Sequence, residues 1–290
     1  MQAYRKIVDE ININQQFKML TQAYQEHAIV QINMARFSVL SSREFMDDLA
    51  EIFTNVKASY EKYLQRLSIK GKQEHLDRVR KNGREVIILL SSNGKFYGDL
   101  VTKICRLFTE VAKQTTADLV IVGSEGKKFF DESHINKPYT YIDLPDTNIN
   151  IETLKPLIHA IIDYQKATIF YGKFSNIILQ TPAQASLSGD MPTSTKPKNA
   201  DAEEDFLFEP DVENVIEFFE GQIISMLLSQ TVSEGKLARF ASRIKAMEFA
   251  QNNLQKQLSI LTSGEKRLKS MGMNKKQLQL FAGRALWNKK

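Results

Sequence analysis

The organisation of the chain is decided by residues 237–268, LARFASRIKAMEFAQNNLQKQLSILTSGEKRL, in its last third. Apolar side chains recur there at intervals of three and four residues, and polar residues interrupt the series only at Gln251 and Glu265. The apolar positions are Leu237, Phe240, Ile244, Met247, Leu254, Leu258, Leu261 and Leu268. Such a frame, sustained over more than four heptads, predicts a long helix in a coiled coil.

The predicted helix extends beyond this frame in both directions. It begins near Glu209, where Pro210 suits a first helical turn and the neighbouring acids favour the helix dipole. No proline follows Pro210. At 1.5 Å per residue, about 80 helical residues span roughly 120 Å, far more than a globular domain of this size. We therefore expect this helix to project beyond its own domain and to lie against another structure.

Residues 1–66 contain no glycine and no proline, and they predict the partner of that helix. Apolar residues follow one another at helical spacing through most of the segment. They include Ile13, Phe17, Leu20, Tyr24, Ala28, Ile32, Ala35 and Val39. The pattern indicates one long helix, or two with an interruption at Ser41–Ser42, packed antiparallel to the C-terminal helix.

The middle of the chain predicts a small α/β domain with a largely parallel sheet. Apolar runs typical of buried strands alternate with helical stretches. The expected strands are 86–90, 119–122, 139–144 and 167–174, with a hairpin strand at 177–181; the expected helices are 100–115 and 154–164. Ala183–Glu204 is polar and predicts a linker. The fold class is thus a Rossmann-like α/β domain inserted between coiled-coil helices, with domains at 1–66, 67–204 and 205–290.

Two turns between strand and helix are the best candidates for binding chemistry. The first is Ser91–Gly98 (SSNGKFYG), and the second is Gly123–Lys128 (GSEGKK). Glycine-containing turns at such places cradle phosphate in α/β proteins, but they also form tight turns for purely structural reasons. Neither spacing matches GxGxxG or GxxxxGK[ST], so we favour the structural interpretation.

The charge and the cysteine and histidine content of the chain bear on whether it binds nucleic acid, metal or membrane. The net charge of +5 suits nucleic acid or an anionic membrane, but it is equally typical of a solvated surface, which we favour; we expect no nucleic-acid partner. Cys105 is the single cysteine, and the four histidines lack metal-binding spacing, so we expect no disulfide, metal or cofactor. Without a signal peptide or an apolar run of about 20 residues, we expect contact with a membrane only through partners.

Five segments, in order along the chain, resemble the gamma subunit of rotary F-type ATP synthases. They are VIILLSSNGKFYGDL (86–100), IVGSEGKKFF (121–130), FYGKFSNIILQTP (170–182), DFLFEPD (205–211) and ARFASRIKAMEFAQNNLQ (238–255). The turn at Asn93 lacks the family's Asp-Arg and cysteine, and Ser270 replaces its glutamine. The chain thus resembles a divergent member, either of a housekeeping synthase or of a specialised rotary ATPase.

The resemblance implies a non-catalytic central shaft that couples rotation to ATP synthesis or hydrolysis. Its implied partners are alpha and beta subunits in a hexamer, an epsilon-type subunit and a ring of membrane subunits, at the cytoplasmic face of a bacterial membrane. The implied contacts with beta subunits and the bearing are Arg243, Lys269, Ser270, Met273, Leu278, Phe281 and Trp287. Those with the ring are Phe206, Phe208 and Glu209.

Part of this is also open to other interpretations. Beyond Leu268 the apolar residues of the tail are flanked by basic ones, as in a frayed terminus or in a helix that contacts another protein. We favour the contact, because Phe281 and Trp287 are large apolar side chains. A non-rotating coiled-coil scaffold and a phosphate-binding α/β enzyme are the alternatives to the shaft.

Overall fold

The computed structural model describes residues 2–66, 83–147, 149–187 and 212–287. It divides into two compact units, which are described separately. Unit 1 comprises Met1–Ala28 and Arg243–Lys290, and unit 2 comprises Ile29–Ser242. No helix among the described residues combines the length and apolar character needed to cross a membrane.

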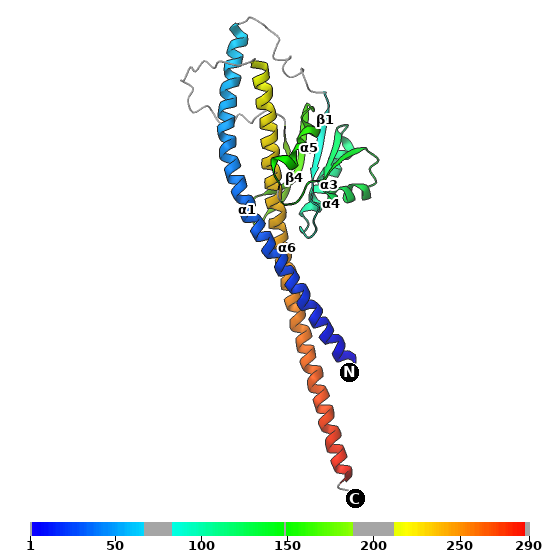
Figure 1. The fold of residues 1–290 in the computed structure, drawn as a ribbon. Helices are drawn as coiled ribbons and strands as arrows, with labels where there is room; N and C mark the ends of the chain where they lie inside the picture. Colours follow the sequence, from blue (N-terminus) through cyan, green and yellow to red (C-terminus); the bar gives the residue numbers. More distant parts are fainter. Residues whose placement is uncertain (1, 67–82, 148, 188–211, 288–290) are drawn as a thin grey trace. The chain divides into compact units, whose positions relative to one another are not determined.

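Two long helices come from the two ends of the chain (Figure 1). Helix α1 spans Gln2–Arg66 and helix α6 spans Val212–Trp287, and each contributes to both units. Helix α1 occupies the segment without glycine or proline, and it continues through Ser41–Ser42. The sequence was compatible with one helix or with two separated at Ser41–Ser42, and the structure has one. Helix α6 continues beyond Leu268, where the heptad frame ends, and through Gly272.

The helices of unit 1 run antiparallel, because residues later in α1 contact residues earlier in α6. The contacts are hydrogen bonds between Tyr4 and Glu265 (3.0 Å), Lys18 and Gln255 (2.6 Å), and Gln25 and Gln251 (2.6 Å). From Gln251 to Leu268, each position of the predicted heptad frame is half-buried, and the residues described beyond Leu268 are exposed. The predicted coiled-coil frame of α6 is therefore confirmed.

The predicted contact face of α1 is wrong over residues 13–20. Ile13, Phe17 and Leu20 are 50%, 54% and 49% exposed. The half-buried positions lie one residue further on, at Asn14, Lys18 and Thr21. Here α1 contributes polar side chains to the seam, α6 contributes Leu254, Leu258 and Leu261, and the apolar stripe of α1 faces outward.

Unit 2 is built around a five-stranded sheet with the strand order β3-β2-β1-β4-β5. Strands β1 to β4 are parallel to their neighbours, and β5 pairs with β4 in the antiparallel sense. The strands are β1 (Glu85–Leu90), β2 (Asp118–Val122), β3 (Tyr139–Ile142), β4 (Lys166–Phe174) and β5 (Gln180–Ser186). The helices are α3 (Leu100–Gln114), α4 (Ser124–Glu132) and α5 (Ile151–Ile161). This is the predicted Rossmann-like arrangement.

Both faces of the sheet are covered by helices, which explains the continuous apolar strands. Side chains alternate between the faces along each strand. Val86, Ile88 and Leu90 of β1 point towards α5 and α6, whereas Ile87 and Leu89 point towards α3 and α4. Figure 1 shows α6 running along one face of the sheet with α5 beside it.

The predicted linker from Ala183 begins too early. Residues up to Ser186 belong to β5, and Leu187 is buried in the core. Its polar sequence misled the prediction because β5 is an edge strand, which exposes alternate side chains and tolerates Pro182. The expected strand at Ile177–Thr181 is mostly the turn that precedes β5.

Candidate functional site

The two segments singled out from the sequence lie side by side at the carboxyl edge of the sheet; the first is a turn, whereas the second, Gly123–Lys128, forms the start of α4 from Ser124 onward. They follow β1 and β2, which are parallel neighbours with Leu90 paired to Val122. In an open α/β sheet this edge is the usual place for a ligand. The site therefore has the position expected of a phosphate cradle, and its hydrogen bonds decide whether it can act as one.

The backbone N–H groups at the start of α4, which have no partner within the helix, donate hydrogen bonds to the neighbouring turn. The N–H of Ser124 donates to Asn93 Oδ1 at 2.7 Å, and that of Glu125 donates to the Ser92 carbonyl at 2.9 Å. The N–H of Gly126 donates to Ser91 Oγ at 2.9 Å. These are the donors that a helix N-terminus offers to a phosphate. The β1–α3 turn thus caps α4.

The N–H groups of the first turn are occupied by a carboxylate from the same chain. Asp146, between β3 and α5, accepts the N–H of Asn93 at 3.1 Å and that of Gly94 at 2.6 Å. An internal anion therefore holds the place that a phosphate would take. This favours the structural interpretation of the turn.

Glycine is required at two positions by close packing of the turns. Gly123 has φ 91°, and a Cβ there would lie 2.9 Å from the Ser92 backbone. A Cβ on Gly126 would lie 2.4 Å from Ser91 Oγ. The glycines of GSEGKK thus serve the contact between the turn after β1 and the start of α4, and they leave no gap for a ligand between them.

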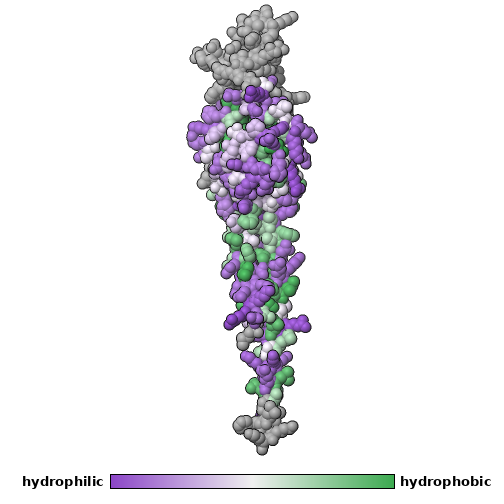
Figure 2. Space-filling view, turned by 90° about the vertical axis from the view of Figure 1, so that its right-hand side faces the viewer, coloured by the Kyte–Doolittle hydropathy of each residue, from purple (hydrophilic) through white to green (hydrophobic). Residues whose placement is uncertain are grey.

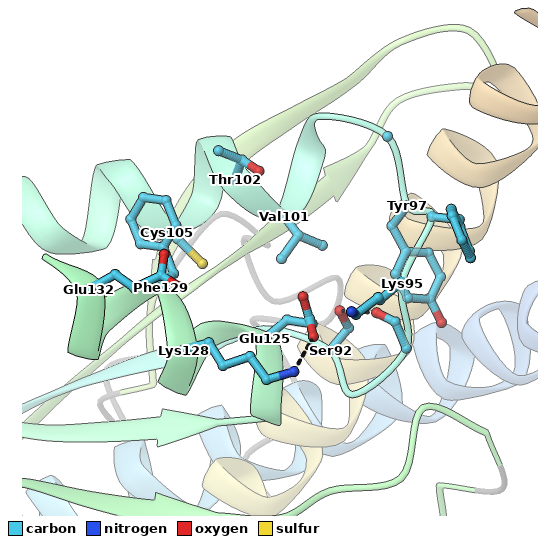
Figure 3. A pocket seen from close by; sticks show the side chains of 13 residues that line it. Ser92, Lys95, Tyr97, Val101, Thr102, Cys105, Glu125, Lys128, Phe129 and Glu132 are labelled. Atoms are coloured by element: carbon cyan, nitrogen blue, oxygen red, sulfur yellow. Dashed lines mark hydrogen bonds and ion pairs between the residues drawn. The ribbon is translucent and has the colours of Figure 1, made fainter. Parts of the chain in front are cut away.

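A cavity of about 470 Å³ lies beside this contact, between α3, α4 and the turn after β1 (Figure 3). Figure 3 shows Lys95, Lys128 and Glu125 around the opening, with Lys128 and Glu125 joined at 2.9 Å. Glu132 also lines the cavity, so two lysines face two glutamates. These charges cancel, which makes the cavity a poor selector of anions.

Cys105 lines the same cavity but is not suited to nucleophilic chemistry. Burial and, to a lesser degree, the Glu125 charge raise the pKa of its thiol to about 12. The thiol is therefore protonated at neutral pH, whereas the thiolate is the reactive form. Within the described part of the chain, histidine, cysteine and acidic side chains form no group of three or more that could hold a metal ion.

The predicted partner contacts on the shaft fall into three sets. Arg243 is 5% exposed, and its guanidinium lies over the Tyr24 ring within unit 1. A second set is exposed on α6 beyond the seam: Lys269, Ser270, Met273, Leu278 and Phe281. Trp287 is the last residue of α6, and the structure does not describe its side chain. The third set, Phe206, Phe208 and Glu209, lies outside the described residues.

The apolar surface of unit 1 is larger than the sequence predicted. Besides the α1 stripe, Phe249 and Ile260 on α6 are each 70% exposed. Figure 2 shows apolar side chains reaching the surface among hydrophilic ones along these helices. The periodicity identified the apolar residues of α1 but could not show which of them face outward.

A sequence model of the ATP synthase family matches residues 3–269. The ATP synthase gamma chain of Ruthia magnifica subsp. Calyptogena magnifica is 24% identical over 264 residues, covering 87% of this chain and 88% of the relative. That of Verminephrobacter eiseniae is 22% identical and covers 98% of each chain. A chain in the central stalk and c-ring structure of the Tetrahymena thermophila mitochondrial ATP synthase has a similar fold. Its TM-score is 0.58 at 17% identity, covering 80% of this chain and 99% of that chain.

Proposed function

Because this chain belongs to the ATP synthase gamma-chain family, we propose that it turns as the central shaft of a rotary ATPase. In this role it couples rotation to ATP synthesis or hydrolysis at surrounding beta subunits and performs no bond chemistry itself. An asymmetric shaft presents a different face to each of the catalytic sites around it. The rotational angle of the shaft therefore affects which sites hold nucleotide, and nucleotide binding in turn affects the angle.

The observation that carries the proposal is the surface of unit 1. Over residues 14–21 the α1 side of the helix pair is polar, and large apolar side chains face outward. On α1 these include Ile13, Phe17, Met19 and Leu20, and on α6 Phe249, Ile260, Met271, Met273, Leu278, Leu280 and Phe281. Apolar surface exposed on this scale favours burial against another protein. A shaft inside a sleeve provides that burial.

The exposed end of α6 is the proposed bearing contact. Lys269 and Ser270 begin it, and Met273, Leu278 and Phe281 supply apolar side chains further along; Trp287 is proposed to continue this contact. Arg243 is proposed to act near beta-subunit loops, although its side chain already stacks on Tyr24.

The other end of the shaft is proposed to meet the membrane part of the complex. Phe206, Phe208 and Glu209 are proposed to contact a ring of membrane subunits, with an epsilon-type subunit nearby. This arrangement would place the chain peripherally, at the cytoplasmic face of a bacterial membrane. The central stalk and c-ring named for the Tetrahymena structure support this part of the proposal.

The decisive experiment is an affinity purification of the tagged chain from its native cells. We expect alpha- and beta-type ATPase subunits at about three copies each per chain, together with ATPase activity. Purification of the chain alone, or with unrelated proteins, would reject the shaft and favour a scaffold. The small subunits in the same sample would identify what the motor drives.

A pair of variants tests the bearing contact in the same preparation. Phe281→Asp places a charge on the exposed apolar end of α6, and we expect at least a tenfold loss of coupled ATPase activity or of assembly. Ser259→Asp places the same charge on an exposed polar position of the helix and should have little effect. Equal behaviour of the two variants would argue against an apolar bearing.

A further inference from the structure

Helix α6 is joined to the turn after β1 by directional contacts as well as by apolar packing. Arg239 Nη1 donates to the Ser91 carbonyl at 3.0 Å, and Ser242 Oγ donates to the Tyr97 carbonyl at 2.7 Å. The Phe240 ring meets the Tyr97 ring edge-on, with 5.7 Å between centroids. Arg239 and Ser242 are three residues apart, so both project from the same side of the helix. The contacts hold that side against both ends of the turn.

Arg239 also connects α6 to a second loop of the domain. Its Nη2 lies 3.9 Å from Asp146 Oδ1, and the same carboxylate accepts the N–H groups of Asn93 and Gly94. The Arg239 side chain is 3% exposed and that of Asp146 is 16% exposed. An ion pair with so little water around it is costly to break, because a buried charge would be left without its partner.

The backbones at this joint approach closely, which leaves little room for movement. A Cβ added to Gly172 of β4 would lie 3.2 Å from the Ala238 Cβ of α6. A Cβ added to Gly235 of α6 would lie 3.1 Å from Leu90 Cδ2 of β1. Glycines on both sides therefore let helix and sheet meet with small side chains between them.

We propose that Arg239, Ser242 and Asp146 form a clamp that carries torque between α6 and the α/β domain. Close packing limits the movement of the helix, but hydrophobic attraction has no direction and selects one angle about the helix axis less strongly than directional bonds do. Hydrogen bonds to two carbonyl groups and an ion pair to a second loop fix the angle of the helix. These three are positioning residues, and their role rests on the proposed function as a rotor.

The test measures torsional stiffness in the assembled complex. The hexamer is fixed to a surface, and a gold particle is attached through Gln114→Cys, an exposed position at the end of α3. Native Cys105 is buried and should not be labelled. In Arg239→Leu we expect the variance of the particle's angle within each catalytic pause to rise at least twofold. An unchanged variance would overturn the clamp.

Two further variants separate the clamp from a general effect on folding. Arg239→Lys keeps the charge opposite Asp146 and should recover part of the lost stiffness, a recovery that mere destabilisation does not predict. Should Arg239→Leu fail to assemble, Ser242→Ala removes one directional contact and should still raise the variance. Wild-type variance in Ser242→Ala would then reject the proposal.

A matched control and the wild-type complex complete the test. Lys103→Met removes an ion pair with Asp99 on the exposed side of α3, joined at 2.5 Å, and should leave the variance unchanged. If Lys103→Met raised the variance as much as Arg239→Leu, the clamp would be rejected. If the wild-type complex fails to assemble or its particle does not turn, the rotor function itself is wrong. If the wild type turns and Arg239→Leu matches its variance, only the clamp is wrong.

Discussion

The guanidinium of Arg243 on α6 lies over the ring of Tyr24 on α1, with 5.6 Å between the guanidinium carbon and the ring centroid. Arg243 is buried, so this contact forms inside the helix pair and away from solvent. A cation over an aromatic face is stabilised more strongly when water is excluded. The pair therefore links the two helices at the point where unit 1 begins on α6.

The Arg243–Tyr24 contact predicts a measurable coupling energy. In a double-mutant cycle with Arg243→Met and Tyr24→Leu, we expect a coupling of about 0.5–2 kcal/mol in the free energy of unfolding of the helix pair. Urea denaturation followed by circular dichroism at 222 nm provides the measurement. Tyr24→Phe keeps the ring and should retain most of the coupling. A loss in Tyr24→Phe as large as that in Tyr24→Leu would show that the ring face is not responsible.

The Gln25–Gln251 hydrogen bond predicts that an apolar seam would be more stable than the present one. Both side chains are half-buried, with Gln251 Nε2 donating to Gln25 Oε1 at 2.6 Å. Replacing both with leucine should raise the stability of the helix pair by about 1–2 kcal/mol. Gln25→Leu alone leaves the Gln251 amide without its partner and should cost about 1 kcal/mol. Urea midpoints distinguish these outcomes, and a single variant as stable as the double variant would contradict the argument.

The long helices show what periodicity reveals and what it leaves open. In α6 the heptad frame identified the contact positions, because apolar side chains occupy most of them. In α1 the apolar residues Ile13, Phe17 and Leu20 predicted the helix but face outward. An apolar stripe indicates that something covers it, and the sequence alone does not say whether that is this chain or another.

At the site near Asn93, too, the sequence predicted some features and missed others. The strands and the first turn were predictable, since VIILL and LVIV are buried runs and SSNGKFYG is rich in turn residues. The second predicted turn, Gly123–Lys128, is helical from Ser124 onward. The role of Asp146 was not, because its partners are more than 50 residues away in the chain. Arg239 lies at a polar position of the heptad frame, which normally faces solvent, but in the structure it is buried and contacts Ser91 and Asp146 of the α/β domain. The small residues Gly235, Ala238 and Ser242 around it were the available signal of close packing.

Gly126→Ala should destabilise unit 2 through a clash with Ser91. The new Cβ would lie 2.4 Å from Ser91 Oγ and 2.7 Å from Ser91 Cβ. Ser91 must then move, and its hydrogen bond to the Val122 carbonyl (2.6 Å) is lost. We expect a loss of about 2–3 kcal/mol in urea denaturation. Gly272→Ala on α6 meets nothing within 4 Å, and should gain about 0.5–1 kcal/mol. Equal stability of the two variants would refute the packing argument.

The buried thiol of Cys105 predicts a loss of stability in alkali. Its pKa is raised from 9.0 to about 12 in the folded chain, so the unfolded chain loses the proton first as the pH rises. Stability is therefore complete below pH 9 and declines between pH 9 and 12, by about 1.4 kcal/mol per pH unit from this group. Urea denaturation at pH 8 and pH 10 measures the decline. In Cys105→Ala the part of the decline that comes from the thiol should disappear. An identical decline in the variant and the wild type would show that another group is responsible.

Asp146→Ala should convert the turn at Asn93 into an anion site. The wild-type chain should gain no stability from 10 mM phosphate or acetate beyond that from chloride at equal ionic strength, because Asp146 already accepts the N–H groups of Asn93 and Gly94. The variant loses this acceptor and should be destabilised by about 2–3 kcal/mol. Acetate, which supplies the missing carboxylate, should restore part of that loss in thermal denaturation. Stabilisation of the wild type by phosphate would instead support the phosphate-binding alternative, and a variant that acetate does not restore would show that Asp146 is not an internal anion of this turn.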